Sequence, residues 1–192
     1  MSTDLTTTPR VFVARKAFFS FLGRVFRIYG TDESLLYYIK RKAFKLKDEL
    51  NVFRDEGQQD LAMVIQARSI FDFGATFDVS VPGSEPLGAC RRQGLKSILR
   101  DEWTLLGPGD VPIGKIIEDS MLLALLRRFF FQGLFPQTFS IYDGEEKKGH
   151  IKQRWNPFQL AYDVDCSRVV GIDARLVTAA TILLLSVEGR QQ

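Results

Sequence analysis

The sequence is poor in the residues that most often build catalytic and metal sites. Its 192 residues include one histidine and two cysteines. Zinc sites and Ser–His or Cys–His schemes need several such groups placed together. The single histidine, His150, belongs to the polar segment KKGH, which we interpret as a turn, and no glycine-rich phosphate loop precedes a helix. We therefore expect no catalytic residues, no enzyme activity and no cofactor.

The two cysteines also exclude a disulfide-rich scaffold. Cys90 and Cys166 have no paired spacing, and both lie in apolar, strand-like runs. We expect reduced thiols in the core. The N-terminal segment MSTDLTTTPR lacks the charged start and apolar centre of a signal peptide, which predicts a cytoplasmic protein.

Composition is otherwise that of one globular domain. Hydrophobic residues make up 45% and charged residues 26%, with a net charge of +3. We expect a flexible tail over residues 1–9 and a single domain over residues 10–190. Phenylalanine is unusually frequent, with sixteen copies.

Turn signals divide the chain into short segments. They contain Gly, Pro and Asp, which favour tight turns, and they fall at residues 30–32, 55–57, 82–84, 107–110 and 143–144. Between them lie runs rich in Val, Ile, Phe and Tyr, at residues 24–29, 35–40, 61–66, 76–81, 137–142 and 159–165. Short strands joined by tight turns predict an antiparallel sandwich or barrel.

The segment after Asp173 predicts a buried helix. Asp173 is a suitable N-cap, and residues 176–187 contain no charged side chain. A helix that is apolar on every side is buried on every side. Twelve residues span only about 18 Å at a rise of about 1.5 Å, too short for a membrane core of about 30 Å. We therefore expect this helix to run through the middle of the β structure rather than across a membrane.

A second helix is expected near residues 120–132, within the segment SMLLALLRRFFFQGLF. Its apolar spacing fits a helix that caps the barrel. Leu123 and Phe131 lie off the main apolar face, and Arg127 and Arg128 adjoin them, so these four residues are candidates for a protein-partner contact.

Short motifs recur along the chain. RKAF occurs at residues 15–18 and 41–44, and RRQGLK at residues 91–96 is a looser relative. Arg68 with FDV at residues 77–79 is echoed by Arg154 with YDV at residues 162–164. The copies are too short and irregular for a solenoid. We interpret them as one strand–corner–strand device reused around a closed sheet, with Phe facing the core and Arg and Lys facing outward.

Several motifs together resemble the bacterial branch of the LURP-one-related family, which shares the tubby-like fold with tubby and the phospholipid scramblases. They are VFRIYG, LLYYIKRKAFKLKDELNVF, ARSIFDF, RRQGLKSILRDEW, QRWNPFQLAYDVD and the terminal helix. The resemblance covers residues 10–190. It implies a mainly β fold, an antiparallel closed barrel of about twelve strands around the buried C-terminal helix. It also implies a lipid-associated, regulatory or scaffolding role without catalysis.

Scramblases carry an acidic segment before the terminal helix, so the resemblance makes calcium a possible ligand here. The matching acids are Asp163, Asp165 and Asp173, with Arg168 among them. Calcium prefers six to eight oxygen ligands. Two exposed strand acids and a helix cap explain the segment better, so these three residues are only weak metal candidates.

Anionic membrane lipid is the partner that the charge pattern favours, at the cytoplasmic membrane surface. The candidates form two hairpins, and if these adjoin they make one basic rim: Arg41, Lys42, Lys45 and Lys47, with Arg91, Arg92, Lys96 and Arg100. A rim balanced by neighbouring acids, without lipid binding, is an equal alternative. A protein scaffold or regulatory module that uses the Phe-rich second helix is another alternative, and an enzyme of unknown type is the outside alternative. Nucleic acid is less favoured, because the aromatics follow the strand pattern instead of forming a stacking surface.

Overall fold

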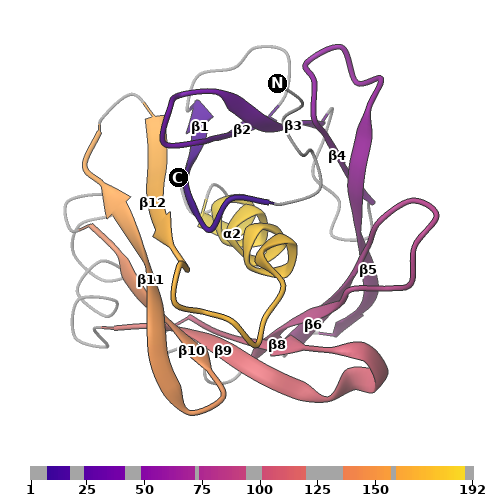
Figure 1. The fold of residues 1–192 in the computed structure, drawn as a ribbon, viewed down its shortest axis with the longest axis vertical. Helices are drawn as coiled ribbons and strands as arrows, with labels where there is room; N and C mark the ends of the chain where they lie inside the picture. Colours follow the sequence, from indigo (N-terminus) through magenta and orange to yellow (C-terminus); the bar gives the residue numbers. More distant parts are fainter. Residues whose placement is uncertain are drawn as a thin grey trace.

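The computed structural model contains a closed barrel with a helix along its middle (Figure 1). It describes residues 8–17, 24–41, 49–71, 74–93, 101–119, 136–156 and 159–188. All strand pairs are antiparallel, and each strand pairs with its neighbours in the chain. The barrel closes where β1 pairs with both β2 and β12. The predicted mainly β barrel of about twelve strands is confirmed.

The strands follow the predicted turns closely. They are β1 (Val11–Ala17), β2 (Arg24–Tyr29), β3 (Leu35–Arg41), β4 (Leu50–Phe53), β5 (Leu61–Phe71), β6 (Gly74–Ser80), β7 (Gly88–Gln93), β8 (Glu102–Leu106), β9 (Pro112–Glu118), β10 (Thr138–Asp143), β11 (Glu146–Arg154) and β12 (Gln159–Asp165). A short 3₁₀ turn, η2 (Pro108–Asp110), lies between β8 and β9. The helix expected near residues 120–132 lies outside the described residues.

Helix α2 (Ala174–Glu188) fills the barrel, as the apolar segment predicts. Its described side chains from Leu176 to Ser186 are buried, and they join one core with the inward residues of the strands. Thr178, Thr181 and Ser186 donate their hydroxyls to the carbonyls of Ala174, Val177 and Ile182, one turn earlier, at 2.8–2.9 Å. The helix therefore satisfies its buried hydroxyls within itself.

The antiparallel order sorts the connections between the two ends of the barrel. Because each connection joins adjacent strands, those that follow odd-numbered strands leave from one end. Those that follow even-numbered strands, including the segment from β12 to α2, leave from the other end. Helix α2 thus begins at the second end and finishes at the first.

The two halves of the barrel, β1–β6 and β7–β12, repeat the same register. Arg15 of β1 lies opposite Ala161 of β12, two positions before Asp163. In the same way, Arg91 of β7 lies opposite Thr76 of β6, two positions before Asp78. A register shift precedes the last residue of β2 against β3, and another precedes the last residue of β8 against β9. A shift of six strands therefore relates the halves.

The turns that follow β2 and β8 are also equivalent. Each begins with a glycine, Gly30 or Gly107, whose N–H donates to the carbonyl four residues later, at 2.9 Å and 2.8 Å. In each, the N–H of the fourth residue donates back to the glycine carbonyl at 3.1 Å. That fourth residue, Glu33 or Asp110, has a φ of 61° in both turns. The same backbone device is used twice.

Candidate functional site

The strand ends that flank the predicted basic hairpins lie at the same end of the barrel. β3 finishes at Arg41 and β7 finishes at Gln93, both odd-numbered strands. The hairpins are not adjacent, however, because β5 and β6 lie between them, and β4 and β7 are about 14 Å apart at the usual strand spacing. The strand order therefore does not place the two hairpins side by side, and their corners lie outside the described residues. Of the predicted lipid-binding residues, Lys42, Lys45, Lys47, Lys96 and Arg100 and the side chain of Arg41 lie outside the described residues.

The two ends differ sharply in the sequence of their connections. Those that follow odd-numbered strands contain seven basic and five acidic residues, and those that follow even-numbered strands contain two basic and nine acidic residues. The first set also contains eleven aromatic residues and the second set none. The eleven are Phe18, Phe19, Phe21, Phe44, Phe73, Phe129, Phe130, Phe131, Phe135, Trp155 and Phe158. We call the first the aromatic end and the second the acidic end.

Ten of the sixteen phenylalanines therefore belong to connections at the aromatic end. All ten lie outside the described residues, so for them the expectation that the aromatics follow the strand pattern stays a prediction. Phe12, Phe26 and Phe139 do follow it, since they are fully buried inside the barrel.

Arg91 and Arg92 are the two predicted lipid-binding residues whose side chains are described. Arg91 is half-buried, and its Nε lies 3.4 Å from the hydroxyl of Thr76, to which it donates. Arg92 forms an ion pair with Asp101, at 2.6 Å, and the two side chains are 26% and 9% exposed. Asp101 also accepts, through its backbone carbonyl, the N–H of Glu118 at 2.9 Å. Arg92 is thus part of a local polar cluster and less available to a lipid headgroup.

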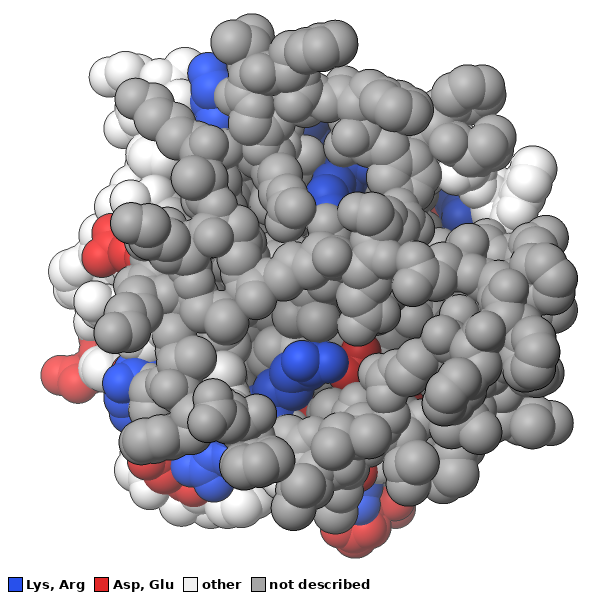
Figure 2. Space-filling model, turned by 180° about the vertical axis from the view of Figure 1, so that it is seen from behind, with Lys and Arg blue, Asp and Glu red and all other residues white. Residues whose placement is uncertain are grey.

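On the face seen in Figure 2, the described Lys and Arg side chains lie at separate points and do not form one continuous patch. Lys16, from the first RKAF copy, is buried, and its Nζ lies 3.5 Å from the carbonyl of Leu185 in the last turns of α2. The expectation that Lys16 points outward is wrong. A positive charge beside the C-terminus of a helix is stabilising, because the helix dipole is negative there.

The four partner-contact candidates, Leu123, Arg127, Arg128 and Phe131, lie outside the described residues. Among the residues that are described, no helix is both long and apolar enough to cross a bilayer.

The three weak calcium candidates each have a separate partner. Arg154 holds Asp163, and Asp165 accepts the N–H and the hydroxyl of Ser167 at 2.9 Å and 2.7 Å. Asp173 caps α2 by accepting the N–H of Arg175 at 2.8 Å. Hydrogen bonds from Ser167 lower the pKa of Asp165, and a hydrogen bond from the Arg175 side chain lowers the pKa of Asp173. Within the described part of the chain, no three His, Cys, Asp or Glu side chains gather as metal ligands would.

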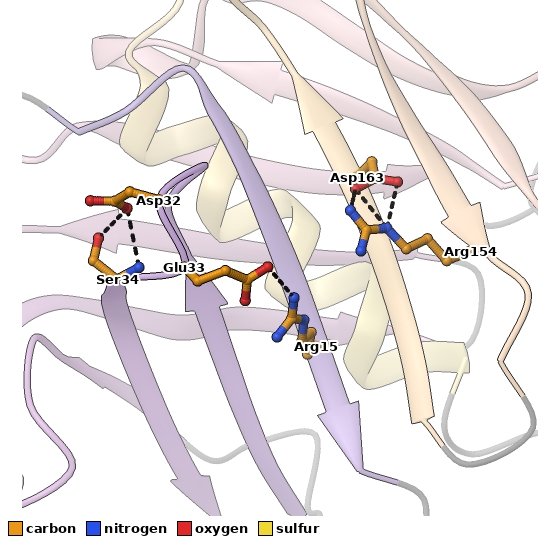
Figure 3. Close-up of polar contacts among 6 residues, drawn as sticks. All are labelled: Arg15, Asp32, Glu33, Ser34, Arg154 and Asp163. Atoms are coloured by element: carbon orange, nitrogen blue, oxygen red, sulfur yellow. Dashed lines mark hydrogen bonds and ion pairs between the residues drawn. The ribbon is translucent and has the colours of Figure 1, made fainter.

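Two ion pairs lie beside a groove on the outer wall, and Figure 3 shows both pairs. Arg154 of β11 donates to both carboxylate oxygens of Asp163 on β12, at 2.6–2.9 Å. Arg15 of β1 donates to Glu33 in the turn after β2, at 2.8 Å. The groove has a volume of about 360 Å³ and is also lined by His150. In the other half of the barrel, Arg68 donates to both Asp78 and Asp110. The repeated motifs around Arg68 and Arg154 therefore mark two equivalent ion pairs, Arg68–Asp78 and Arg154–Asp163.

The sequence context of His150 predicts a turn, but this prediction is wrong. His150 belongs to β11, opposite Ser140 of β10 and Asp165 of β12, and its side chain is exposed. The turn is instead Gly144 and Glu145. Gly149 makes this possible, because a Cβ there would lie 2.6 Å from the carbonyl oxygen of Asp165. Asp165 is thus an acidic neighbour of His150 that sequence reasoning missed.

The cysteines are free, buried thiols, as predicted. Burial raises the pKa of Cys166 to about 11 and raises the pKa of Cys90 further. Cys90 Sγ lies 3.8 Å from the carbonyl of Leu176 on α2. Neither thiol is poised as a thiolate nucleophile at neutral pH.

A scan against protein-family models and searches of curated proteins and of solved structures found no significant match for this chain. The resemblance to the LURP-one-related family therefore stays a prediction from the sequence motifs.

Proposed function

We propose that the protein is a non-catalytic barrel that binds anionic phospholipid at the cytoplasmic membrane surface, with its aromatic end toward the bilayer. The observation that supports this most is the separation of residue types between the two ends. Every aromatic residue of the connections belongs to the aromatic end, together with seven of their nine basic residues. The tubby-like resemblance points in the same direction.

Aromatic and basic residues attract a membrane in different ways. Aromatic rings favour the interface between headgroups and acyl chains. Each lysine or arginine near an anionic surface contributes about 1 kcal/mol, and salt weakens that contribution. An end that has both is suited to reversible attachment, and the acidic end would be repelled by the same surface.

The local structure changes which residues test the proposal. Arg92 is held by Asp101, so reversing its charge would disturb the fold and the rim together. Lys42 and Lys45 are the better test pair. Lys147, near the start of β11, and Arg168, in the segment before α2, are exposed and form a control pair with the same change in net charge. Lys147 has only an exposed ion pair, with Asp119 at 3.7 Å, which contributes little to stability.

The test is co-sedimentation with vesicles of neutral lipid, with and without anionic lipid, at low and high salt. We expect salt-sensitive binding that needs anionic lipid and that falls at least about tenfold in the Lys42→Glu, Lys45→Glu variant. The Lys147→Glu, Arg168→Glu variant should bind like the wild type. Equal losses in both variants, or no binding by the wild type, would reject the proposal in favour of a protein scaffold.

A further inference from the structure

Trp155 is a large apolar side chain that the barrel leaves in solvent. It directly follows β11, at the aromatic end, and 67% of its surface is exposed. The other tryptophan, Trp103, has 0% exposure inside the barrel. The other large hydrophobic residues that are exposed in the described part of the chain are Val11, Val111 and Val170, and all three lie at the acidic end.

The internal repeat indicates that the fold does not require an aromatic residue here. Arg154 holds Asp163 as Arg68 holds Asp78 in the other half. The residue after Arg68 is Ser69, and Ile70 is the match if the register shift near Arg68 is counted. Neither is aromatic, although β5 and β6 form the equivalent Arg–Asp ion pair; their hairpin is tighter, with two connecting residues against four between β11 and β12. The Arg–Asp ion pair therefore forms without an aromatic residue at the next position.

The charge around Trp155 does not oppose contact with an anionic surface. Arg154, its neighbour, is neutralised by Asp163 in a two-oxygen ion pair, and Asn156 on the other side is uncharged. The indole ring has an apolar body and one N–H donor. That combination places tryptophan at the level of the lipid headgroups.

We propose that Trp155 inserts into the interfacial layer of an anionic bilayer and anchors the barrel with its aromatic end toward the membrane. This inference rests on the proposed function and adds to it the residue that enters the lipid. Because the insertion removes apolar surface from water, loss of the ring should weaken attachment without affecting the fold.

The experiment uses tryptophan fluorescence of the full chain with anionic vesicles that contain lipids brominated along their acyl chains. In the wild type, we expect the emission of Trp155 to shift to shorter wavelength and to be quenched on binding. The Trp155→Phe variant should lose this response, because Trp103 is buried in the barrel.

Affinity gives a second readout. The Trp155→Ser variant should bind the same vesicles about tenfold more weakly. The matched control is Val170→Ser, which removes the most exposed valine, 75% exposed, at the acidic end and should leave affinity unchanged. Urea unfolding should give the same midpoint for Trp155→Ser and the wild type.

The outcomes separate the two proposals. Salt-sensitive binding by the wild type without quenching, or with unchanged affinity in Trp155→Ser, would overturn the role of Trp155 and leave lipid binding standing. Absence of wild-type binding to anionic vesicles would overturn both.

Discussion

The two ends of the barrel are built from different chemistry. At the acidic end, carboxylates hold the connections in place. Asp55 accepts the N–H groups of Gln59 and Asp60, and Asp143 accepts those of Val170 and Gly171, all at 2.8–3.2 Å. Asp165 and Asp173 act in the same way on Ser167 and Arg175. Much of the acidity of this end is therefore turn chemistry.

No such explanation covers the sequence of the aromatic end. Phenylalanine, leucine and lysine do not form tight turns through their side chains, and their accumulation there is not needed to reverse the chain. Charged residues at the two ends therefore carry different information about the molecule. Acids that accept backbone N–H groups report the fold, whereas a basic and aromatic surplus without that role is the better indicator of a partner.

The largest effect on the free energy of unfolding should come from Arg92, and it should exceed the effect of its neighbour Arg91. Replacing Arg92 with Leu leaves Asp101, 9% exposed, without its ion pair and should lower the free energy of unfolding by about 2 kcal/mol. The matched change Arg91→Leu removes one long hydrogen bond and should cost less than about 1 kcal/mol. Urea unfolding measures both. Equal costs would place Arg92 back among the rim charges.

An intermediate effect should appear as acid sensitivity at the acidic end. The pKa of Asp143 is lowered from 3.8, chiefly by the N–H of Gly171 and also by Val170 and Lys148. A lowered folded pKa stabilises the protein above the ordinary value and loses that effect as pH falls through the folded value. Asp143→Asn should therefore cost about 1 kcal/mol at pH 7 and almost nothing near pH 2. Urea midpoints across this range measure it.

A constant difference between Asp143→Asn and the wild type at all pH values would show that the charge of Asp143 does not hold the segment before α2. The acidic end would then lose part of its contrast with the aromatic end.

The smallest effect concerns backbone strain, which also marks the acidic end. The three described non-glycine residues with positive φ, Glu33, Gln58 and Asp110, all lie in its turns. Gln58 has a φ of 59° and an exposed side chain, so Gln58→Gly should raise stability by up to about 1 kcal/mol. Gln59→Gly, at a residue without positive φ, should not. Thermal unfolding compares the two, and a gain in both variants would remove the strain argument.

Much of the fold could be predicted because its signals are local. The turns at residues 30–32, 55–57 and 107–110 have Gly, Pro and Asp, and they bound β2, β5 and β9. The sequence predicts the buried helix because twelve successive residues without charge form a helix that is apolar on every side.

What could not be predicted depends on pairs across the barrel. Lys16 looks like an exposed strand residue in the sequence. Only the position of α2 shows that its ammonium group donates to a carbonyl of the helix. Gly149 made the KKGH segment resemble a turn, although the glycine serves close approach to β12. The repeat of Arg68 and Arg154 was visible, but its meaning required the register of both halves. The separation of the two ends likewise depends on strand order and cannot be read from one segment.

The position of α2 in the chain sets the order in which the molecule can be completed. During synthesis, all twelve strands leave the ribosome before the helix that fills them. β1 must also wait for β12, its partner across the closure, although the two are far apart in the chain. Until α2 follows, the inward side chains of the strands have no helix to pack against. We expect a slow final step in which the wall and the helix become ordered together, and chaperones would meet this protein as an open sheet.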